Sequence, residues 1–333
     1  MTGSESQDGE PTPEIATASD TPTAQRGSWK SYAQLMRLPA VFTALADIFL
    51  GFMLTHAEIG DAPAPLILLL VTSACLYLAG MVFNDLFDRQ VDAVERPQRP
   101  IPSGRVAVRS AAMLGGGLVA TGLGGAAALR WVDPILCGWN PLFVAVLIVA
   151  ALFLYDGLLK STSIGPVTMG LCRFLNVILG ASASGFLFGK PFYHPQRWIA
   201  AGLAVYIAGV TWFARSEATE SRRGPLLWGL AVINAGLAIL LGWVWQGQPG
   251  PAKTLPLLLL AAIALSINKS LLAAISRPDP QRVQNTIRTL LLSVITLDAA
   301  LIYAKSGDIA LATTIAVALL VPPFIVGRAI RIT

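Results

Sequence analysis

The chain has few charged residues and few side chains that bind transition metals. Only 13% of its 333 residues are charged, and it contains two histidines and three cysteines. Cys75, Cys137 and Cys172 show no metal-ligand spacing and lie in or beside apolar segments, which is typical of packing residues. Because no basic stretch is interleaved with aromatic residues, the net charge of +5 does not indicate binding to nucleic acid.

Long apolar runs make up most of the sequence. Hydrophobic residues account for 54% of the chain, and the mean hydropathy is +0.64. Runs long enough to cross a hydrocarbon core of about 30 Å lie at about residues 38–57, 64–83, 110–129, 141–158, 166–188, 198–215, 225–245, 255–275, 287–304 and 308–327. Runs of this length must be helical, since a lipid-exposed backbone cannot leave its amides unpaired. The predicted fold is all-α, a polytopic transmembrane helical bundle with nine to ten spans.

The two parts of the chain differ sharply in composition. Residues 1–28 are rich in Ser, Thr, Pro and acidic residues, which predicts a disordered polar tail without the features of a secretory signal peptide. Residues 29–333 are predicted to form a single bundle. The predicted location is the cell (inner) membrane. Lys and Arg gather in alternate loops, so the positive-inside rule predicts that both termini are cytoplasmic.

A dense group of acids follows the second apolar run. The segment reads Asn84-Asp85-Leu86-Phe87-Asp88-Arg89-Gln90-Val91-Asp92. If the helix continues, about 100° of turn per residue places the three aspartates inside an arc of about 60°, with the asparagine about 40° beyond. Several hard oxygen ligands in one place suit Mg²⁺ shared with substrate phosphates. The sequence therefore predicts a magnesium-diphosphate site, with Asn84, Asp85, Asp88 and Asp92 as metal ligands and the three aspartates as catalytic residues.

Cationic side chains near these acids are candidate diphosphate ligands. Arg96 and Arg99 lie in a loop, residues 95–105, that three prolines hold in an extended conformation. Tyr155 and Lys160 lie at the cytoplasmic end of the fourth run. For a lone loop arginine, an ordinary positive-inside role is equally expected, and a lysine at a helix end often only snorkels to the headgroups.

Two more groups extend the predicted site. Arg173 and Asn176 lie one turn apart inside the fifth run, and buried membrane cations usually face a cavity, which indicates contact with the diphosphate. Glu217 and Glu220 follow the sixth run and are candidate ligands for a second Mg²⁺. Taken alone, this second acidic pair is more typical of an ordinary solvated helix end.

Two further acids lie within apolar runs, away from the main cluster. Asp47 and Asp298 are expensive in hydrocarbon unless they are paired or protonated. Either residue is a candidate for action on an acceptor substrate. An interhelical hydrogen bond is the favoured interpretation.

Together these motifs resemble the UbiA-type superfamily of intramembrane prenyltransferases, over about residues 30–330. Residues 84–92 fit that family's first signature, Asn-Asp-x-x-Asp-x-x-x-Asp, and the following loop through Ser103-Gly104 is similar as well. Tyr155 and Lys160 look like the residues that close the family's fourth helix, and Arg37-Leu38-Pro39 looks like its usual entry. The resemblance implies an isoprenyl diphosphate donor bound through Mg²⁺ and ionised to an allylic cation. That cation would be captured by an aromatic or other lipophilic acceptor.

The second signature departs from the family pattern of Asp-x-x-x-Asp, because Ser216 and Glu220 occupy its two ends. This departure and the tenth run are similar to a divergent bacterial branch, the EboC-like proteins. Losing one carboxylate leaves open an alternative, a non-catalytic polyprenyl-diphosphate binder or carrier. A secondary transporter is a third hypothesis, although no inverted repeat with broken helices is found. No obligatory protein partner is inferred.

Overall fold

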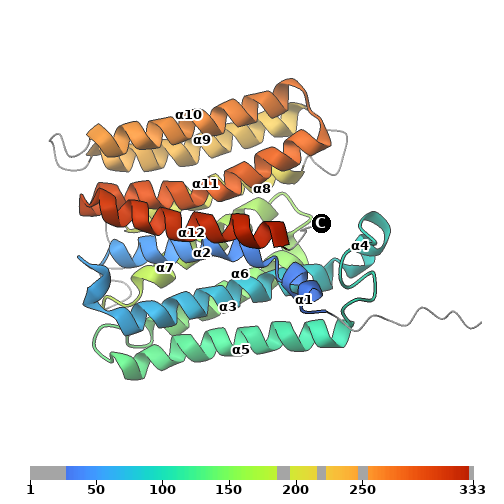
Figure 1. The fold of residues 1–333 in the computed structure, drawn as a ribbon, viewed down its shortest axis with the longest axis horizontal. Helices are drawn as coiled ribbons and strands as arrows, with labels where there is room; N and C mark the ends of the chain where they lie inside the picture. The colour runs from blue at the N-terminus through green and yellow to red at the C-terminus, as the bar shows by residue number, and fades with distance from the viewer. Residues whose placement is uncertain (1–27, 186–195, 216–222, 247–253, 330–333) are drawn as a thin grey trace, which may run out of the picture.

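The structure, a computed structural model, describes residues 28–185, 196–215, 223–246 and 254–329. These residues form helices and no strands, which confirms the all-α prediction (Figure 1). The helices are α1 (Trp29–Leu35), α2 (Val41–Met53), α3 (Pro63–Phe87), α4 (Arg89–Glu95), α5 (Val108–Val132), α6 (Asn140–Leu154), α7 (Gly165–Ala181), α8 (Gln196–Arg215), α9 (Arg223–Gln246), α10 (Thr254–Ser276), α11 (Pro280–Ser306) and α12 (Ile309–Ala329). Short 3₁₀ turns lie at Leu38–Ala40 and Ile59–Asp61, and a π-helix at Tyr155–Leu159 extends α6.

The number of spans agrees with the lower end of the prediction. Among the described residues, eight helices are long and apolar enough to cross a membrane, and a bent pair formed by α1 and α2 brings the number to nine. α7 is also apolar, but with 17 residues it is shorter than these spans and is not counted among them. It ends at Ala181, earlier than predicted, because the chain turns there: Ser182 Oγ donates to Leu179 O, and Gly185 has a φ of +99°. Residues 186–188 of the predicted run lie outside the described residues.

Proline and glycine mark several helix ends. Proline occupies the first turn of α3, α6, α7 and α11, where a missing N–H costs no helical hydrogen bond. α11 ends at Ser306 and is followed by Gly307, whose φ of +71° is strained for residues with a Cβ atom. The local sequence therefore sets the boundaries of these spans before any packing occurs.

The interior of the bundle depends on close helix contacts. α8 packs against α9 and α7, α3 packs against α5, and α2 packs against α7 and α11. α2 and α7 approach closely at two glycines: a Cβ at Gly180 would lie 2.6 Å from Ile48 O, and one at Gly51 would lie 2.1 Å from Val177 O. Small residues allow helix backbones to touch in membranes, where hydrophobic burial between helices supplies little driving force.

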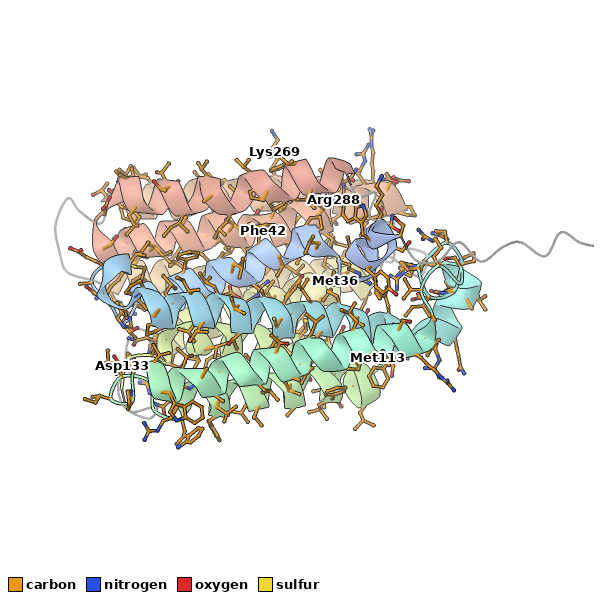
Figure 2. All side chains as sticks on the ribbon, turned by 60° about the horizontal axis from the view of Figure 1, so that its bottom comes forward. Met36, Phe42, Met113, Asp133, Lys269 and Arg288 are labelled. Carbon is orange, nitrogen blue, oxygen red and sulfur yellow. The ribbon has the colours of Figure 1, made fainter. Side chains whose placement is uncertain are left out.

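The outer surface of the bundle is apolar, as hydrocarbon requires. Large apolar side chains such as Ile67, Met113 and Leu265 are more than half exposed. Figure 1 shows α1, α4 and the end of α12 at the same end of the bundle, and Figure 2 shows Asp133 at the opposite end. The chain is therefore a multi-pass membrane protein, with its acidic segment at one end of the spans.

Candidate active site

The acidic segment spans a break between α3 and α4. α3 ends at Phe87 and α4 begins at Arg89, yet the backbone N–H groups of Asp88 and Asp92 still donate to the carbonyls four residues earlier. The helical turn is therefore nearly continuous through the break. At about 100° per residue, Asp92 lies about 20° from Asp85, whereas Asp88 lies about 60° away, toward Asn84. This geometry divides the four predicted ligands into two pairs.

The first pair consists of Asp85 and Asp92, which share one guanidinium. Arg99 Nη1 donates to Asp92 Oδ2 at 2.5 Å and to Asp85 Oδ1 at 3.2 Å, and all three side chains are buried. Arg37 Nη2 also donates to Asp85 Oδ1, at 2.8 Å. Buried carboxylates need such partners, because an unpaired charge in a low-dielectric interior is costly.

Arg37 reaches Asp85 from an unusual backbone conformation. Its φ of +46° is the only positive value at a non-glycine position among the described residues. It lies between α1 and α2, where the two helices meet at 46°. Strained backbone of this kind persists when its surroundings hold it in place. The ion pair with Asp85 is one such contact.

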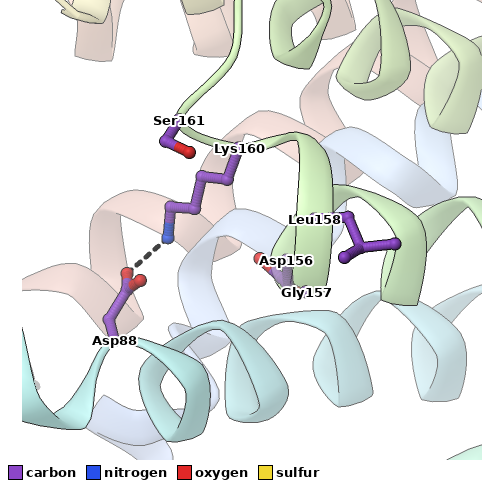
Figure 3. Close-up of a pocket in the computed structure, with 6 residues that line it drawn as sticks. All are labelled: Asp88, Asp156, Gly157, Leu158, Lys160 and Ser161. Atoms are coloured by element: carbon purple, nitrogen blue, oxygen red, sulfur yellow. Dashed lines mark hydrogen bonds and ion pairs between the residues drawn. The ribbon is translucent and has the colours of Figure 1, made fainter.

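The second pair, Asn84 and Asp88, faces the end of α6. Asn84 Nδ2 donates to Asp156 Oδ1 at 2.8 Å, and Lys160 Nζ donates to Asp88 Oδ2. Figure 3 shows Lys160 and Asp88 pointing toward each other beside a pocket of about 330 Å³. The pocket is lined by Asp88, Asp156, Gly157, Leu158, Lys160 and Ser161. It is an opening at the membrane end that contains both an ion pair and a second carboxylate.

A π-helix places Lys160 at this pocket. The wider turn at Tyr155–Leu159 ends α6, and the Lys160 N–H donates to Tyr155 O at 2.8 Å. π-helical turns occur frequently at functional sites. Arg215 Nη2 donates to Lys160 O, so the end of α8 fixes the same turn from outside. Tyr155 itself is buried at the start of the π-helix.

Arg173 and Asn176 lie elsewhere, in the middle of the bundle. Arg173 Nη1 donates to Asp47 Oδ2 at 2.5 Å and to Thr43 O at 2.8 Å, and Asn176 Nδ2 donates to the same Asp47 oxygen at 2.9 Å. Ser73 Oγ donates to Asn176 Oδ1 at 2.7 Å. These contacts join α2, α3 and α7, and they direct both predicted diphosphate ligands toward Asp47. An interhelical hydrogen bond was the interpretation favoured for Asp47, and its contact with Arg173 is one, but the sequence did not identify Arg173 as the partner.

The other predicted residues have different positions. Arg96 follows the last residue of α4, is exposed, and forms no ion pair with another described residue, whereas Arg99 is buried among the acids. Glu217 and Glu220 lie outside the described residues. Sequence analysis gave no role to Asp156 or Arg215. An acid in the last turn of an apolar helix was the available signal for Asp156.

The donor set has the chemistry that Mg²⁺ prefers, since carboxylate and amide oxygens dominate it. In the described residues, no three His, Cys, Asp or Glu side chains are grouped as ligands of one ion, and Arg99, Arg37 and Lys160 pair with the carboxylates instead. An ion would therefore replace cationic side chains as the partner of these oxygens. The side chains of Asp88 and Lys160 are 26% and 31% exposed, so this pair can separate at low cost.

The fold and the site define a class: a multi-pass helical bundle with clustered acids and cations at one membrane end. The model of the UbiA prenyltransferase family matches residues 44–224, more than half of the chain. The chain belongs to the UbiA prenyltransferase family. The family resemblance predicted from the acidic segment is thereby confirmed, and the narrower EboC-like assignment stays a prediction.

Several digeranylgeranylglyceryl phosphate synthases are similar to the chain. The protein from Sulfurisphaera tokodaii is 30% identical over 172 residues, covering 52% of this chain and 56% of that protein. The protein from Methanopyrus kandleri is 36% identical over 163 residues, covering 48% and 52%. The chain thus spans about half the length of these curated relatives.

Solved structures of UbiA homologues share the fold. The apo structure of a homologue from Aeropyrum pernix K1 has a TM-score of 0.62 at 20% identity, covering 78% of this chain and 96% of that one. A homologue from Archaeoglobus fulgidus bound to DMAPP and Mg²⁺ has a TM-score of 0.57 at 16% identity, covering 82% and 99%. At these identities the similarity establishes the arrangement of helices.

Proposed function

We propose that the protein is an intramembrane prenyltransferase that moves an isoprenyl group from a polyprenyl diphosphate to an aromatic or other lipophilic acceptor. The observation that supports this proposal most strongly is the contact of Lys160 with Asp88 at an open pocket beside the buried Asp85–Arg99–Asp92 group. Carboxylates and cations placed together at a membrane end suit a metal-bound diphosphate. Few other ligands need both kinds of charge beside an apolar bundle.

Each charged group has a task in this proposal. Lys160 and Arg99 bind diphosphate oxygens, and Arg37 lies close enough to Asp85 to join them. The carbon–oxygen bond of the donor breaks, and its electron pair leaves with the diphosphate. The acceptor then forms a bond to the allylic carbon and releases a proton. Apolar helices exclude water, which would otherwise capture the allylic cation.

Mg²⁺ is part of the proposal, with Asn84, Asp85, Asp88 and Asp92 as the residues that would hold it. Its chemistry is to neutralise the negative charge that the diphosphate gains as it leaves. Asp88 is the ligand most open to it, because the carboxylate lines the pocket and pairs with a partly exposed lysine. Glu217 and Glu220 remain proposed ligands of a second ion.

The names of the relatives support a proposed donor, and the distribution of basic residues supports a proposed orientation in the membrane. The names of the relatives support a geranylgeranyl group as a donor to test first. Basic residues such as Arg37, Arg99, Lys160 and Arg215 lie at the end of the bundle that carries the acids. The proposed location is the cell (inner) membrane. By the positive-inside rule, this end of the bundle and both termini face the cytoplasm.

The decisive experiment measures turnover. Purified protein in nanodiscs is mixed with Mg²⁺, labelled geranylgeranyl diphosphate and a lipid extract, and released diphosphate is measured. Diphosphate release that requires both the extract and Mg²⁺ supports the prenyltransferase, and the labelled product identifies the acceptor. Saturable binding with no release across many acceptors instead supports the second candidate, a polyprenyl-diphosphate carrier, which Ser216 at a usual carboxylate position favours.

A further inference from the structure

A second group of buried charges lies in the middle of the bundle and takes no part in the proposed reaction. Asp47 of α2, Arg173 of α7 and Asp298 of α11 are at most 9% exposed. Arg173 and Asn176 both donate to Asp47 Oδ2, at 2.5 and 2.9 Å. Helices α2 and α11 pack against each other, and the carboxyl groups of Asp47 and Asp298 are close enough to interact electrostatically.

Three oxygens of this group receive no hydrogen bond from any described residue. They are Asp47 Oδ1 and both carboxyl oxygens of Asp298. The charges do not balance either, since two carboxylates face a single guanidinium. A buried site with one excess negative charge and three unpaired acceptors is very costly in a membrane bundle.

Among the described residues, Arg173 is the cation whose charge acts on both Asp47 and Asp298. Tyr77 of α3 lies beside Arg173 and Asp47, and the Tyr206 hydroxyl of α8 donates to Leu290 O at 2.9 Å. The tyrosines are neutral hydroxyls. The excess charge is removed if one of the two acids binds a proton, or if a cation binds beside them.

We propose that Asp47 and Asp298 share one bound proton, so that Asp298 donates a hydrogen bond to Asp47 Oδ1. One proton removes the excess charge and gives a donor to one of the unpaired oxygens. A metal cation fits less well, because Asp47 Oδ2, Thr43 O and Ala44 O already accept from Arg173 and Asn176. Too few oxygens remain to surround an ion with six ligands.

This proton site ties three helices into one unit. Asp298 lies on α11, Asp47 on α2 and Arg173 on α7. Asn176 of α7 also accepts a hydrogen bond from Ser73, which links α3 to this unit. The charges within it sum to zero, which a network in hydrocarbon requires. The inference does not depend on the proposed transfer reaction, and its test requires no substrate.

Infrared difference spectroscopy tests the proton directly. A protonated carboxyl group has a C=O stretch that is well separated from the bands of a carboxylate. Wild-type protein in nanodiscs, labelled with ¹³C at the aspartate carboxyl groups, is compared with the Asp298→Asn variant at pH 7 and pH 9. We expect a protonated-carboxyl band in the wild type at both pH values, shifted by the label, and its loss in the variant.

Matched variants make the assignment specific. Asp279→Asn changes an exposed carboxylate at the start of the same helix and should leave the band intact. If Asp298→Asn does not fold, Asp298→Ser removes the carboxyl group while keeping a hydroxyl donor, and it should also abolish the band. An identical protonated-carboxyl spectrum in wild type and in a folded Asp298 variant would overturn the proposal. Carboxylate bands alone at pH 7 would overturn it as well.

Discussion

Lys160 Nζ donates to Asp88 Oδ2, which joins the break between α3 and α4 to the π-helix at the end of α6. The two residues are 72 positions apart in the chain. Both side chains are partly exposed at the pocket, whereas the neighbouring Asp85–Arg99 contact is buried. The exposed pair is therefore the part of the site that a ligand reaches first, and the buried pair forms the support behind it.

We expect Asp88→Asn to reduce turnover by at least about 100-fold, the effect of losing one electrostatic group that acts on a transition state. The free energy of unfolding should change by about 1 kcal/mol or less, because an exposed ion pair contributes little to stability. Diphosphate release and thermal unfolding of the same preparation measure both effects. The control is Asp308→Asn, an exposed aspartate before α12. Wild-type turnover in Asp88→Asn would refute the site.

Removing Arg99 should reveal whether the buried acids bind a divalent ion. Arg99→Met leaves Asp85 and Asp92 with Arg37 as their remaining cation, and breaking a buried ion pair typically costs about 3–5 kcal/mol. Mg²⁺ should recover part of this loss by replacing the guanidinium between the two carboxylates. Thermal unfolding with and without MgCl₂ measures the recovery, with KCl at equal ionic strength as the control. Equal stabilisation by the two salts would contradict a metal site at these residues.

Substitution of Arg173 tests whether this residue stabilises the bundle or binds the diphosphate, as its sequence position predicted. Because its guanidinium bonds Asp47 and the Thr43 carbonyl, Arg173→Met should destabilise the bundle by about 3–5 kcal/mol. The affinity of the folded fraction for geranylgeranyl diphosphate should stay within about twofold, because the Arg173 guanidinium pairs with Asp47 and does not line the pocket. Unfolding and ligand-binding titrations distinguish the roles. Unchanged stability with much weaker binding would instead support the predicted contact of Arg173 with the diphosphate.

The sequence predicted the elements of the fold because membrane spans are local features. A long apolar run must form a helix whatever its neighbours are, and each predicted run overlaps one of the described helices. The acidic segment could be predicted for the same reason, since its spacing fixes which acids share a face. The prediction grouped Asp88 with Asp85 and Asp92 on one face, and it did not foresee that Asp88 pairs with Lys160 while Asp85 and Asp92 pair with Arg99.

The contacts between helices could not be predicted in this way. The pairing of Asn84 with Asp156, and of Arg173 with Asp47, depends on which helices become neighbours, and nothing in the local sequence determines that. The sequence therefore predicted a ligand for Arg173 without identifying Asp47, which lies 126 residues away in the chain. A charge in an apolar run indicates that a partner exists without identifying it.

The close approach of α2 and α7 gives the last prediction. A Cβ at Gly180 would lie 2.6 Å from Ile48 O and 2.9 Å from Ile48 Cα, and neither backbone atom can move without shifting α2. Gly180→Ala should therefore destabilise the protein by about 1–3 kcal/mol, the usual cost of overpacking a core. The matched control is Gly124→Ala in α5, where a Cβ meets nothing within 4 Å and a gain of about 0.5–1 kcal/mol is expected. Thermal unfolding of both variants in the same nanodiscs measures the difference, and equal stability of the two would show that the helices do not touch at Gly180.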